Sequence, residues 1–295
     1  MRTNKLIILA VAGLAVLAAC NREGISPAGD PKPITIEAAI GSMTKVTTTG
    51  NTASFDNGDQ LVLYAWTGDK TAVPAAKVVN GVENSYDGTK WTPASQMLWA
   101  DMTSEHYFLG VYPARVITDF TADPYTLDPA DYEGSDLLIA TSLTGLKASD
   151  NPVALNFDHA VSKLFVNLTF RNQWAAAPAV SAISVTARKI GTVDYLSKTV
   201  TASATEAAAP VSLTKIENAA WSGLQLPQSG VNTITITIEG KDYVFTHSSD
   251  IPLVGGQYTT VNLIVGRNTI DLASVGISNW AAGATIDDGE AQTSD

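Results

Sequence analysis

The sequence has little of what most metal, redox and nucleic-acid sites require. Its 295 residues include one cysteine, so no intramolecular disulfide can form, and three histidines that are too widely scattered along the sequence to build the four-ligand site of a structural zinc with it. There are 18 basic and 29 acidic residues, which gives a formal net charge of −11. Because so acidic a chain repels phosphate backbones, we expect no nucleic-acid partner, and no motif indicates a cofactor or a metal.

Long apolar stretches are also scarce. The main one, Leu6–Val16, follows Arg2 and Lys5 and is shorter than the roughly 18 residues that a membrane span needs. This layout is typical of a signal peptide, which we assign to residues 1–19. The Leu17-Ala18-Ala19-Cys20 string resembles the bacterial lipoprotein box, whose cysteine is lipidated and becomes the first mature residue. The resemblance implies a lipid on Cys20 and an outer-membrane anchor.

The segment that follows reads as a tether. Residues 20–33 are polar after Cys20, have no apolar period, and contain Pro27, Pro31 and Pro33. Such a segment would let the folded part of the protein stand off the bilayer.

From Ile34 onward, apolar residues recur at every second position in short runs, which predicts an all-β protein. The clearest hairpin is Thr233–Ile238, then a turn over Glu239–Asp242, then Tyr243–Thr246. Asn-Gly, Asp-Gly and Gly-Gly turns between the runs favour β-sandwiches. Further strands are expected at Gln60–Trp66, Tyr107–Tyr112, Val153–Phe157, Lys163–Phe170, Ala182–Ala187 and Tyr258–Val265.

The length favours two domains, since a typical domain has about 150 residues. A cluster of turn residues, Ala148–Pro152, is followed by one more apolar run, so we place the boundary near residue 160. The expected domains are residues 34–160 and 161–295. The Ala-rich stretch Ala202–Pro210 is compatible with either a helical turn or a loop.

Strings that suggest catalysis are weak. Ser42-Met43-Thr44-Lys45 matches the S-x-x-K string of serine acylating enzymes, and Ser149-Asp150-Asn151 matches their S-D-N. The Lys must lie one helical turn after the Ser, whereas the residues around Ser42 favour strand and turn, and K-T-G is absent. We therefore expect no enzyme, and we assign no catalytic residue.

The other polar and aromatic residues each allow a functional and a purely structural interpretation. Asp56-Asn57-Gly58-Asp59 carries oxygen ligands but lacks the downstream Glu of a calcium loop, so a tight turn is favoured. Paired acids could flank a glycosidic bond, but the sequence does not give their separation. Tryptophans could form a sugar-stacking platform, although a place in the core is favoured for each. The histidines, His106, His159 and His247, are read as packed or solvent-facing side chains.

Several strings, in order, resemble the fimbrillin family of Bacteroidales, the lipoprotein pilins of the type V pilus. They span nearly the whole mature chain. The strings are the lipobox at Cys20, Phe55–Tyr64 with its F-x-x-G-D entry, Trp91 and Trp99 before Tyr107–Pro113, Asp136–Ala140, Phe157–Leu164 with its F-x-H-x-x-x-K-L pattern, and the closing Ile277–Trp280.

The resemblance implies two transthyretin-like β-sandwiches and assembly by strand exchange. In this family a protease removes the first strand after a basic residue, and a strand from the next subunit fills the groove. Here the first strand is expected at Ile34–Ile40, and Lys45 stands where the family usually has Arg. The resemblance does not decide between a shaft and a tip subunit.

The resulting hypothesis is a surface-exposed outer-membrane lipoprotein that polymerises into an adhesive fimbrium. Its expected partners are other pilus subunits, the outer membrane through the lipid on Cys20, and a receptor on a host or bacterial surface. Two alternatives stay open: a monomeric lipoprotein that binds glycans, and a glycosidase with paired acids across a cleft.

Overall fold

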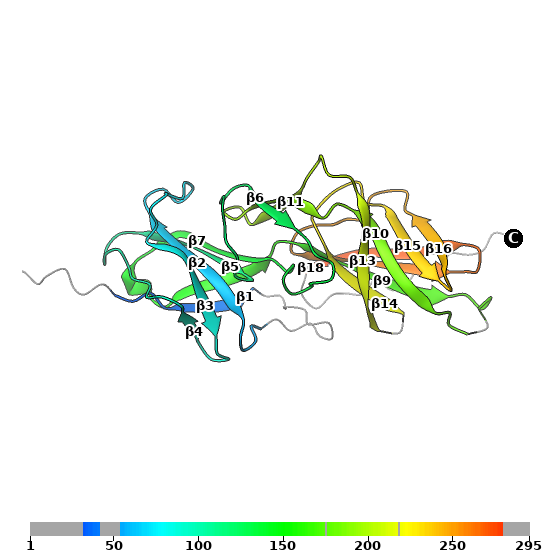
Figure 1. The fold of residues 1–295 in the computed structure, drawn as a ribbon, viewed down its shortest axis with the longest axis horizontal. Helices are drawn as coiled ribbons and strands as arrows, with labels where there is room; N and C mark the ends of the chain where they lie inside the picture. Colours follow the sequence, from blue (N-terminus) through cyan, green and yellow to red (C-terminus); the bar gives the residue numbers. More distant parts are fainter. Residues whose placement is uncertain (1–31, 42–53, 175, 218, 280–295) are drawn as a thin grey trace, which may run out of the picture. The chain divides into compact units, whose positions relative to one another are not determined.

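The computed structural model describes residues 32–41, 54–174, 176–217 and 219–279. These residues form strands β1 to β18 and one 3₁₀ helix, η1 (Ala148–Asp150), which confirms the all-β prediction (Figure 1). Within this part of the chain, no helix has the length and apolar character of a membrane span. The strands form two large sheets, consistent with two tandem β-sandwiches, and one small sheet.

The first sheet has seven strands, and all of them precede residue 160. Its central strands are apolar on both faces because both faces are covered, as for β5, in which every residue is buried. In spatial order the strands are β1 (Ile36–Ile40), β8 (Val153–His159), β7 (Leu138–Leu146), β5 (His106–Tyr112), β2 (Gln60–Thr67), β3 (Val79–Tyr86) and β4 (Trp91–Pro93).

The second sheet has eight strands, all after residue 161. One of its hairpins shows the alternation that the sequence predicts: Ile234, Ile236 and Ile238 are buried, and the threonines between them are half-buried. The spatial order is β16 (Lys241–Thr246), β15 (Thr233–Ile238), β10 (Val180–Ala187), β13 (Ala209–Glu217), β14 (Ala220–Gln225), β9 (Ser162–Phe170), β17 (Gln257–Val265) and β18 (Ile270–Asn279).

One local expectation needs correction, and one open alternative is decided in favour of a loop. The predicted four-residue turn in the hairpin has only two residues, Glu239 and Gly240, with φ of 50° and 76°. Two successive positive φ values are typical of a type I′ turn, which matches the twist of the flanking strands. The stretch Ala202–Pro210 contains no helix, since β12 ends at Ala202 and β13 begins at Ala209.

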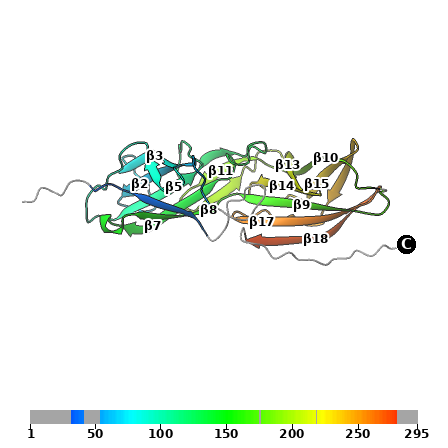
Figure 2. The same ribbon diagram turned by 90° about the horizontal axis from the view of Figure 1, so that it is seen from below.

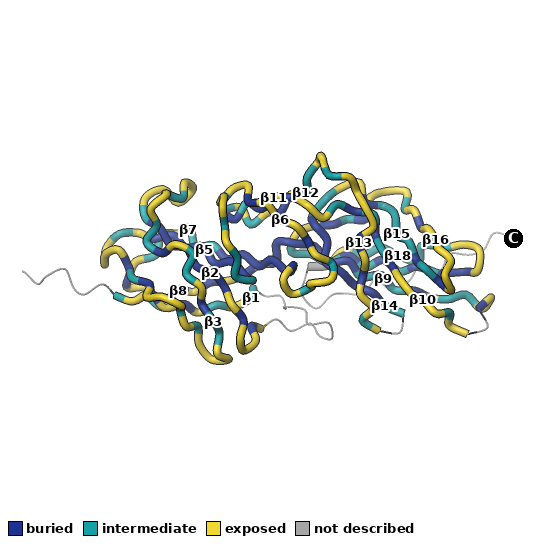
Figure 3. The backbone as a smooth tube through the Cα atoms, in the orientation of Figure 1, coloured by how far each residue is buried: buried dark blue, intermediate teal, exposed yellow. Residues whose placement is uncertain are grey.

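Buried residues fall into two apolar clusters (Figure 3). The first core lies on one face of the first sheet and includes Phe108, Phe157 and Trp99. The second core joins the opposite face of that sheet, with Tyr64 and Leu109, to the inner side chains of the second sheet. The two halves of the chain therefore share a core, which local sequence patterns did not indicate.

A three-stranded sheet also links the two halves. It consists of β6 (Asp123–Thr126), β11 (Ile190–Asp194) and β12 (Thr199–Ala202), in the order β12-β11-β6. The pairing of β6 with β11 is antiparallel, and the backbone N–H of Leu127 adds a bond of 2.8 Å to the carbonyl of Lys189. We call this sheet the junction sheet.

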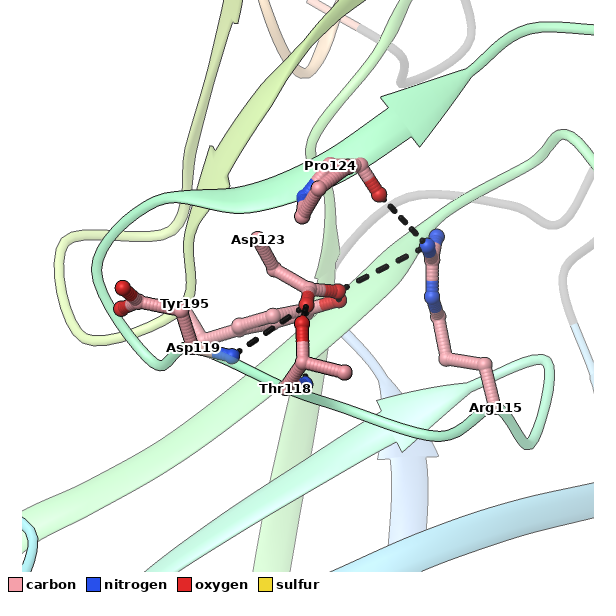
Figure 4. A network of polar contacts seen from close by, with 6 residues as sticks. All are labelled: Arg115, Thr118, Asp119, Asp123, Pro124 and Tyr195. Atoms are coloured by element: carbon pink, nitrogen blue, oxygen red, sulfur yellow. Dashed lines mark hydrogen bonds and ion pairs between the residues drawn. The ribbon is translucent and has the colours of Figure 1, made fainter.

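A buried carboxylate, that of Asp123, organises the junction sheet (Figure 4). It accepts hydrogen bonds from the Tyr195 hydroxyl at 2.9 Å and from the Thr118 hydroxyl at 2.7 Å. The Arg115 guanidinium lies 3.7 Å away and donates to the carbonyl of Pro124. Burial by itself would raise the pKa of Asp123, but hydrogen bonds, led by those from Thr118, outweigh it, so the pKa lies below its ordinary value.

Removing the Tyr195 hydroxyl should weaken this junction. In Tyr195→Phe the buried carboxylate loses a charge-assisted hydrogen bond, and we expect the free energy of unfolding to fall by about 2 kcal/mol. Urea unfolding at neutral pH measures this change. The control is Tyr243→Phe, whose hydroxyl makes an exposed bond to the carbonyl of Arg267, and it should cost less than about 0.5 kcal/mol. Equal losses in the two variants would contradict the role given to Asp123.

The depressed pKa of Asp123 also predicts a pH dependence. A carboxyl whose pKa is lower in the folded state stabilises the protein fully above its unfolded pKa of about 3.9, and this contribution is lost as the pH falls through the folded value. We therefore expect Asp123→Asn to be less stable than the wild type at neutral pH and the gap to narrow below about pH 4. Urea unfolding across this range checks it, with the exposed Asp242→Asn as the control. A gap that is constant with pH would refute the prediction.

Candidate functional site

The first strand of the protein lies at an edge of the first sheet. β1 pairs in parallel with β8, from Ile36 opposite Val153 to Ile40 opposite Phe157 (Figure 2). The predicted strand at Ile34–Ile40 is therefore present, with its regular part at Ile36–Ile40. No strand of the described chain pairs with the other side of β1. An edge strand of this kind leaves half of its backbone groups outside the sheet.

Just before β1, the chain is held from a second side. The backbone N–H of Ile34 donates to the carbonyl of Met97 at 2.8 Å, and that of Trp99 donates to the carbonyl of Lys32 at 3.1 Å. The segment around Pro33 thus forms a short antiparallel bridge to Leu98. We call the surface made by β8 and residues 97–99 the β1 seat.

Alternate side chains of β1 point into the first core. Ile34 and Ile36 are 2% and 7% exposed, Ala38 and Ile40 are half-buried, and Glu37 faces solvent. Full burial of an isoleucine side chain contributes about 1.5 to 3 kcal/mol. The strand is therefore held chiefly by apolar contacts on one face, and its outer face contributes little.

Two side-chain bonds at the start of β1 are solvent-exposed and neutral, and a third, from the Lys32 ammonium to the Ala148 carbonyl, is charge-assisted and partly buried. The Thr35 backbone N–H donates to the Asn151 side-chain oxygen at 2.9 Å, and the Asn151 amide donates to the Thr35 hydroxyl at 2.9 Å. Asn151 directly follows η1, so the last residue of the S-D-N string is engaged in holding the start of β1. Each such bond contributes about 1 kcal/mol.

Aromatic side chains support the seat from inside. Phe55 packs edge-on against Trp91, Tyr112 and Phe157, with ring centroids 4.9, 5.4 and 5.6 Å away. Phe157 also belongs to β8, the partner of β1. If β1 left, the apolar side chains of β8 that now have 0 to 1% exposure, Val153, Leu155 and Phe157, would be uncovered. The seat would then present both unpaired backbone groups and an apolar surface.

Two sequence-predicted site residues cannot be placed. Cys20, the expected lipidation site, and Lys45, the expected cleavage site, lie outside the described residues, as does Ser42. Both assignments stay predictions.

The predicted turn at Asp56–Asp59 is confirmed. The Asp59 carboxylate accepts from the backbone N–H of Asp56 at 2.8 Å, and its other oxygen accepts from the Tyr112 hydroxyl at 3.0 Å. Glu133 lies at the same distance from that hydroxyl. Together with Asp131, these acids line a hollow of about 290 Å³. A glycosidic oxygen would have to lie between the two carboxylates, and the Tyr112 hydroxyl occupies that position. The pair therefore binds the end of β5, to which Tyr112 belongs, rather than a sugar.

Tryptophan side chains are mostly in the cores, as the sequence analysis favours. Trp91 is half-buried, and Trp280 lies outside the described residues. The four that are buried, with exposed fractions from 0 to 9%, are Trp66, Trp99, Trp174 and Trp221. None of these four can present a ring face to a glycan.

Histidines are packed, and one of them belongs to a buried charged cluster. His106 lies between the Ser104 carbonyl and the Ala100 N–H, and His247 contacts the Ser249 carbonyl. The ring of His159, at the end of β8, lies 2.7 Å from the Asp136 carboxylate. No group of three or more His, Cys, Asp or Glu in the described chain is arranged to hold a metal.

Lys163, near the start of β9, lies beside this cluster with 2% exposure. Its ammonium is 5.0 Å from the ring centre of Tyr132 and 4.8 Å from that of Phe165. Burial lowers the pKa of Lys163 to about 8, against an opposing effect of Asp136. The fold brings three residues together where the chain passes from the first sheet into the second: Asp136, His159 and Lys163. Each of them belongs to one of the sequence strings that resemble the fimbrillin family.

Comparisons with known proteins agree with the architecture. The sequence profile of the fimbrillin-like family matches residues 44–280. A search of curated proteins finds no match.

Similar solved structures come from Bacteroides and Porphyromonas species, and two of them are proteins provisionally named cell adhesion proteins. The one from Bacteroides uniformis is 17% identical, with a TM-score of 0.66, over 84% of this chain and 99% of that one. The one from Bacteroides ovatus is 16% identical, with a TM-score of 0.67, over 86% and 99%.

A third similar structure is the tip fimbrial protein of Porphyromonas gingivalis with a C-terminal truncation. It is 13% identical, with a TM-score of 0.50, over 76% of this chain and 95% of that one. At such identities the likeness concerns the fold. The profile, however, covers most of the sequence, and the chain therefore belongs to the fimbrillin-like family of fimbrial and cell-adhesion proteins.

Proposed function

We propose that this protein is a subunit of an adhesive fimbrium, that it is lipidated on Cys20 and exported to the outer membrane, and that it assembles by donor-strand exchange after cleavage at Lys45. The observation that carries the proposal is the position of β1 at a sheet edge, where it can leave without unthreading any other strand. The role is structural and includes no catalysis.

Three features of the β1 seat support this assembly. Departure of β1 would leave the backbone groups of β8 unpaired, a direct template for an extended strand. It would uncover apolar side chains, which an alternating donor strand can cover again. The two side-chain bonds between Thr35 and Asn151 are exposed, so water can replace them when β1 leaves.

The contacts also define what a donor must look like. The donor's inward side chains have to recur at every second position, as they do at Ile34, Ile36, Ala38 and Ile40. The first two should be bulky and β-branched, and the third should be small. A charged residue at one of these positions would be buried without a partner and excluded. The proposed division of the chain near residue 160 leaves this seat wholly within the first domain.

The monomeric glycan-binding alternative is weakened for the four buried tryptophans, which cannot present a ring face to a glycan. The experiments below separate it from assembly, since a monomeric protein would be trimmed by a protease without growing in mass.

Weakening the inward face of β1 should loosen the strand. Ile36→Ala removes buried apolar contacts worth about 2 kcal/mol, so hydrogen exchange of the amides in residues 36–41 should become about 30-fold faster. Glu37→Ala, one position along on the solvent face, is the matched control and should leave the exchange unchanged. Exchange is followed by mass spectrometry of the full chain. If both variants behave alike, β1 is not held by its inward face.

Cleavage at Lys45 should trigger polymerisation. With a lysine-specific protease at low dose, we expect the wild type to form a ladder of higher-mass species on gel electrophoresis. Lys45→Gln should stay monomeric, and Lys70→Gln, which removes an exposed loop lysine of the first domain, should form the ladder.

A tethered variant tests whether departure of β1 is the step that matters. Ala39 and Asn156 are register partners on exposed positions of β1 and β8, so a disulfide between cysteines placed there should lock the strand. After cleavage this variant should stay monomeric until a reductant is added. Ladders from the locked form, or from Lys45→Gln, would refute the proposed route.

A further inference from the structure

A surface pocket of about 490 Å³ lies on the first domain, away from the β1 seat. It is bordered by β2, by β3 with the loop before it, and by the loop of residues 114–120. A bulge shapes its floor: Leu63 pairs with Val82 and Tyr64 with Asn80, so Gly81 is skipped. Gly81 has φ of 67°, and a Cβ there would come within 3.0 Å of the Tyr64 hydroxyl. Bulges of this kind are over-represented beside functional sites.

The loop that forms the far wall is fixed at several points. The Ala114 N–H donates to the Gln60 carbonyl at 2.8 Å, and the Phe120 carbonyl accepts from the Tyr195 N–H at 2.9 Å. Between them, Thr118 is bound to the buried Asp123, as Figure 4 shows. The wall is thus preorganised, which reduces the entropy lost when a ligand binds. At its tip, Val116 is 83% exposed, an apolar side chain offered to solvent.

The lining combines aromatic and charged groups. The rings of Tyr64 and Phe120 meet edge-on at 5.1 Å, and the Lys77 ammonium lies 5.1 Å from the centre of the Phe120 ring. Lys77 forms no ion pair with a carboxylate of the described chain, and its one polar contact is a long bond of 3.5 Å to its own loop, at Ala75. The other cation in the lining, Arg115, is held by Pro124 and Asp123.

These groups define the ligand. In a chain with a net charge of −11, a lysine without a carboxylate partner offers a charge-assisted contact to an anion. The exposed side chains of Asn80 and Glu83 offer a donor and an acceptor for hydroxyl groups. Val116 and Phe120 offer apolar surface for a ring of C–H groups. We propose that this pocket binds a sugar acid, a pyranose that carries a carboxylate, at the end of a glycan.

This site goes beyond the proposed assembly and is independent of it, because none of its lining residues belongs to β1, β8 or residues 97–99. It would give a fimbrial subunit a receptor specificity that does not depend on polymerisation. A variant that cannot exchange strands should still bind the sugar, and a variant that cannot bind the sugar should still exchange strands.

Titration calorimetry of the purified full chain tests the proposal. The probes are the methyl glycosides of N-acetylneuraminic acid and galacturonic acid, with the neutral methyl galactoside for comparison. We expect at least one acid to bind at least tenfold more tightly than the neutral sugar. Lys77→Ala should weaken that binding about tenfold, and Lys77→Arg should keep it within about threefold, since the charge is retained.

The matched control is Lys241→Ala, which removes a lysine stacked 5.2 Å from the ring of Tyr243 in the second domain. It should leave sugar binding unchanged, and circular dichroism should show both alanine variants to be folded. The proposal is overturned if neither acid binds, if the neutral sugar binds as tightly as the acids, or if Lys77→Ala and Lys241→Ala have equal effects.

Discussion

The backbone of β1 is hydrogen-bonded to the sheet on one side only, by β8, and this asymmetry decides what the strand can do. A central strand such as β5, between β7 and β2, could leave only by breaking two ladders and exposing both cores. When β1 leaves, only its ladder of backbone hydrogen bonds with β8 is broken, and only the first core is uncovered. The cost is several kcal/mol from Ile34 and Ile36, which an incoming strand with similar side chains would restore. The proposed exchange would therefore be close to neutral in free energy, and its barrier would lie in the release of β1.

The junction sheet has the opposite character. Its key bonds, from Tyr195 and Thr118 to Asp123, are buried and charge-assisted, and opening them would leave a carboxylate in an apolar core. The side-chain bonds between Thr35 and Asn151, which hold the start of β1, are neutral and exposed. Local opening follows the weakest contacts, so the edge of the first sheet opens well before the two halves part. In a fimbrium, this order would let subunits exchange strands while their internal linkage stays intact.

Periodicity in the sequence was sufficient for the elements and for part of the site. The alternation of Ile234, Ile236 and Ile238 predicted its hairpin, and the family resemblance placed the first strand at Ile34–Ile40, where β1 lies. Local patterns carry no information about which short strands pair over long distances. Asp123 and Tyr195 are 72 positions apart, and neither belongs to a motif, so the junction sheet was missed. The pocket beside Lys77 was missed for the same reason, since a bulge at one glycine and a loop 30 to 40 residues later create it together.

Charge gives a further reason to favour strand pairing as the mode of assembly. The whole sequence has a net charge of −11, and removal of residues 1–19 would take away two basic residues and no acid, so the subunits would be more acidic still and would repel one another. At physiological salt this repulsion is screened beyond about 8 Å. Two subunits that met through flat acidic surfaces would have to overcome this electrostatic repulsion at short distances. Strand insertion instead relies on backbone hydrogen bonds and on apolar side chains such as Ile36, which are insensitive to net charge. In the proposed assembly the donor and the seat would be different parts of the chain, so each contact would leave one of each open, and the assembly would extend as a filament rather than close into a dimer.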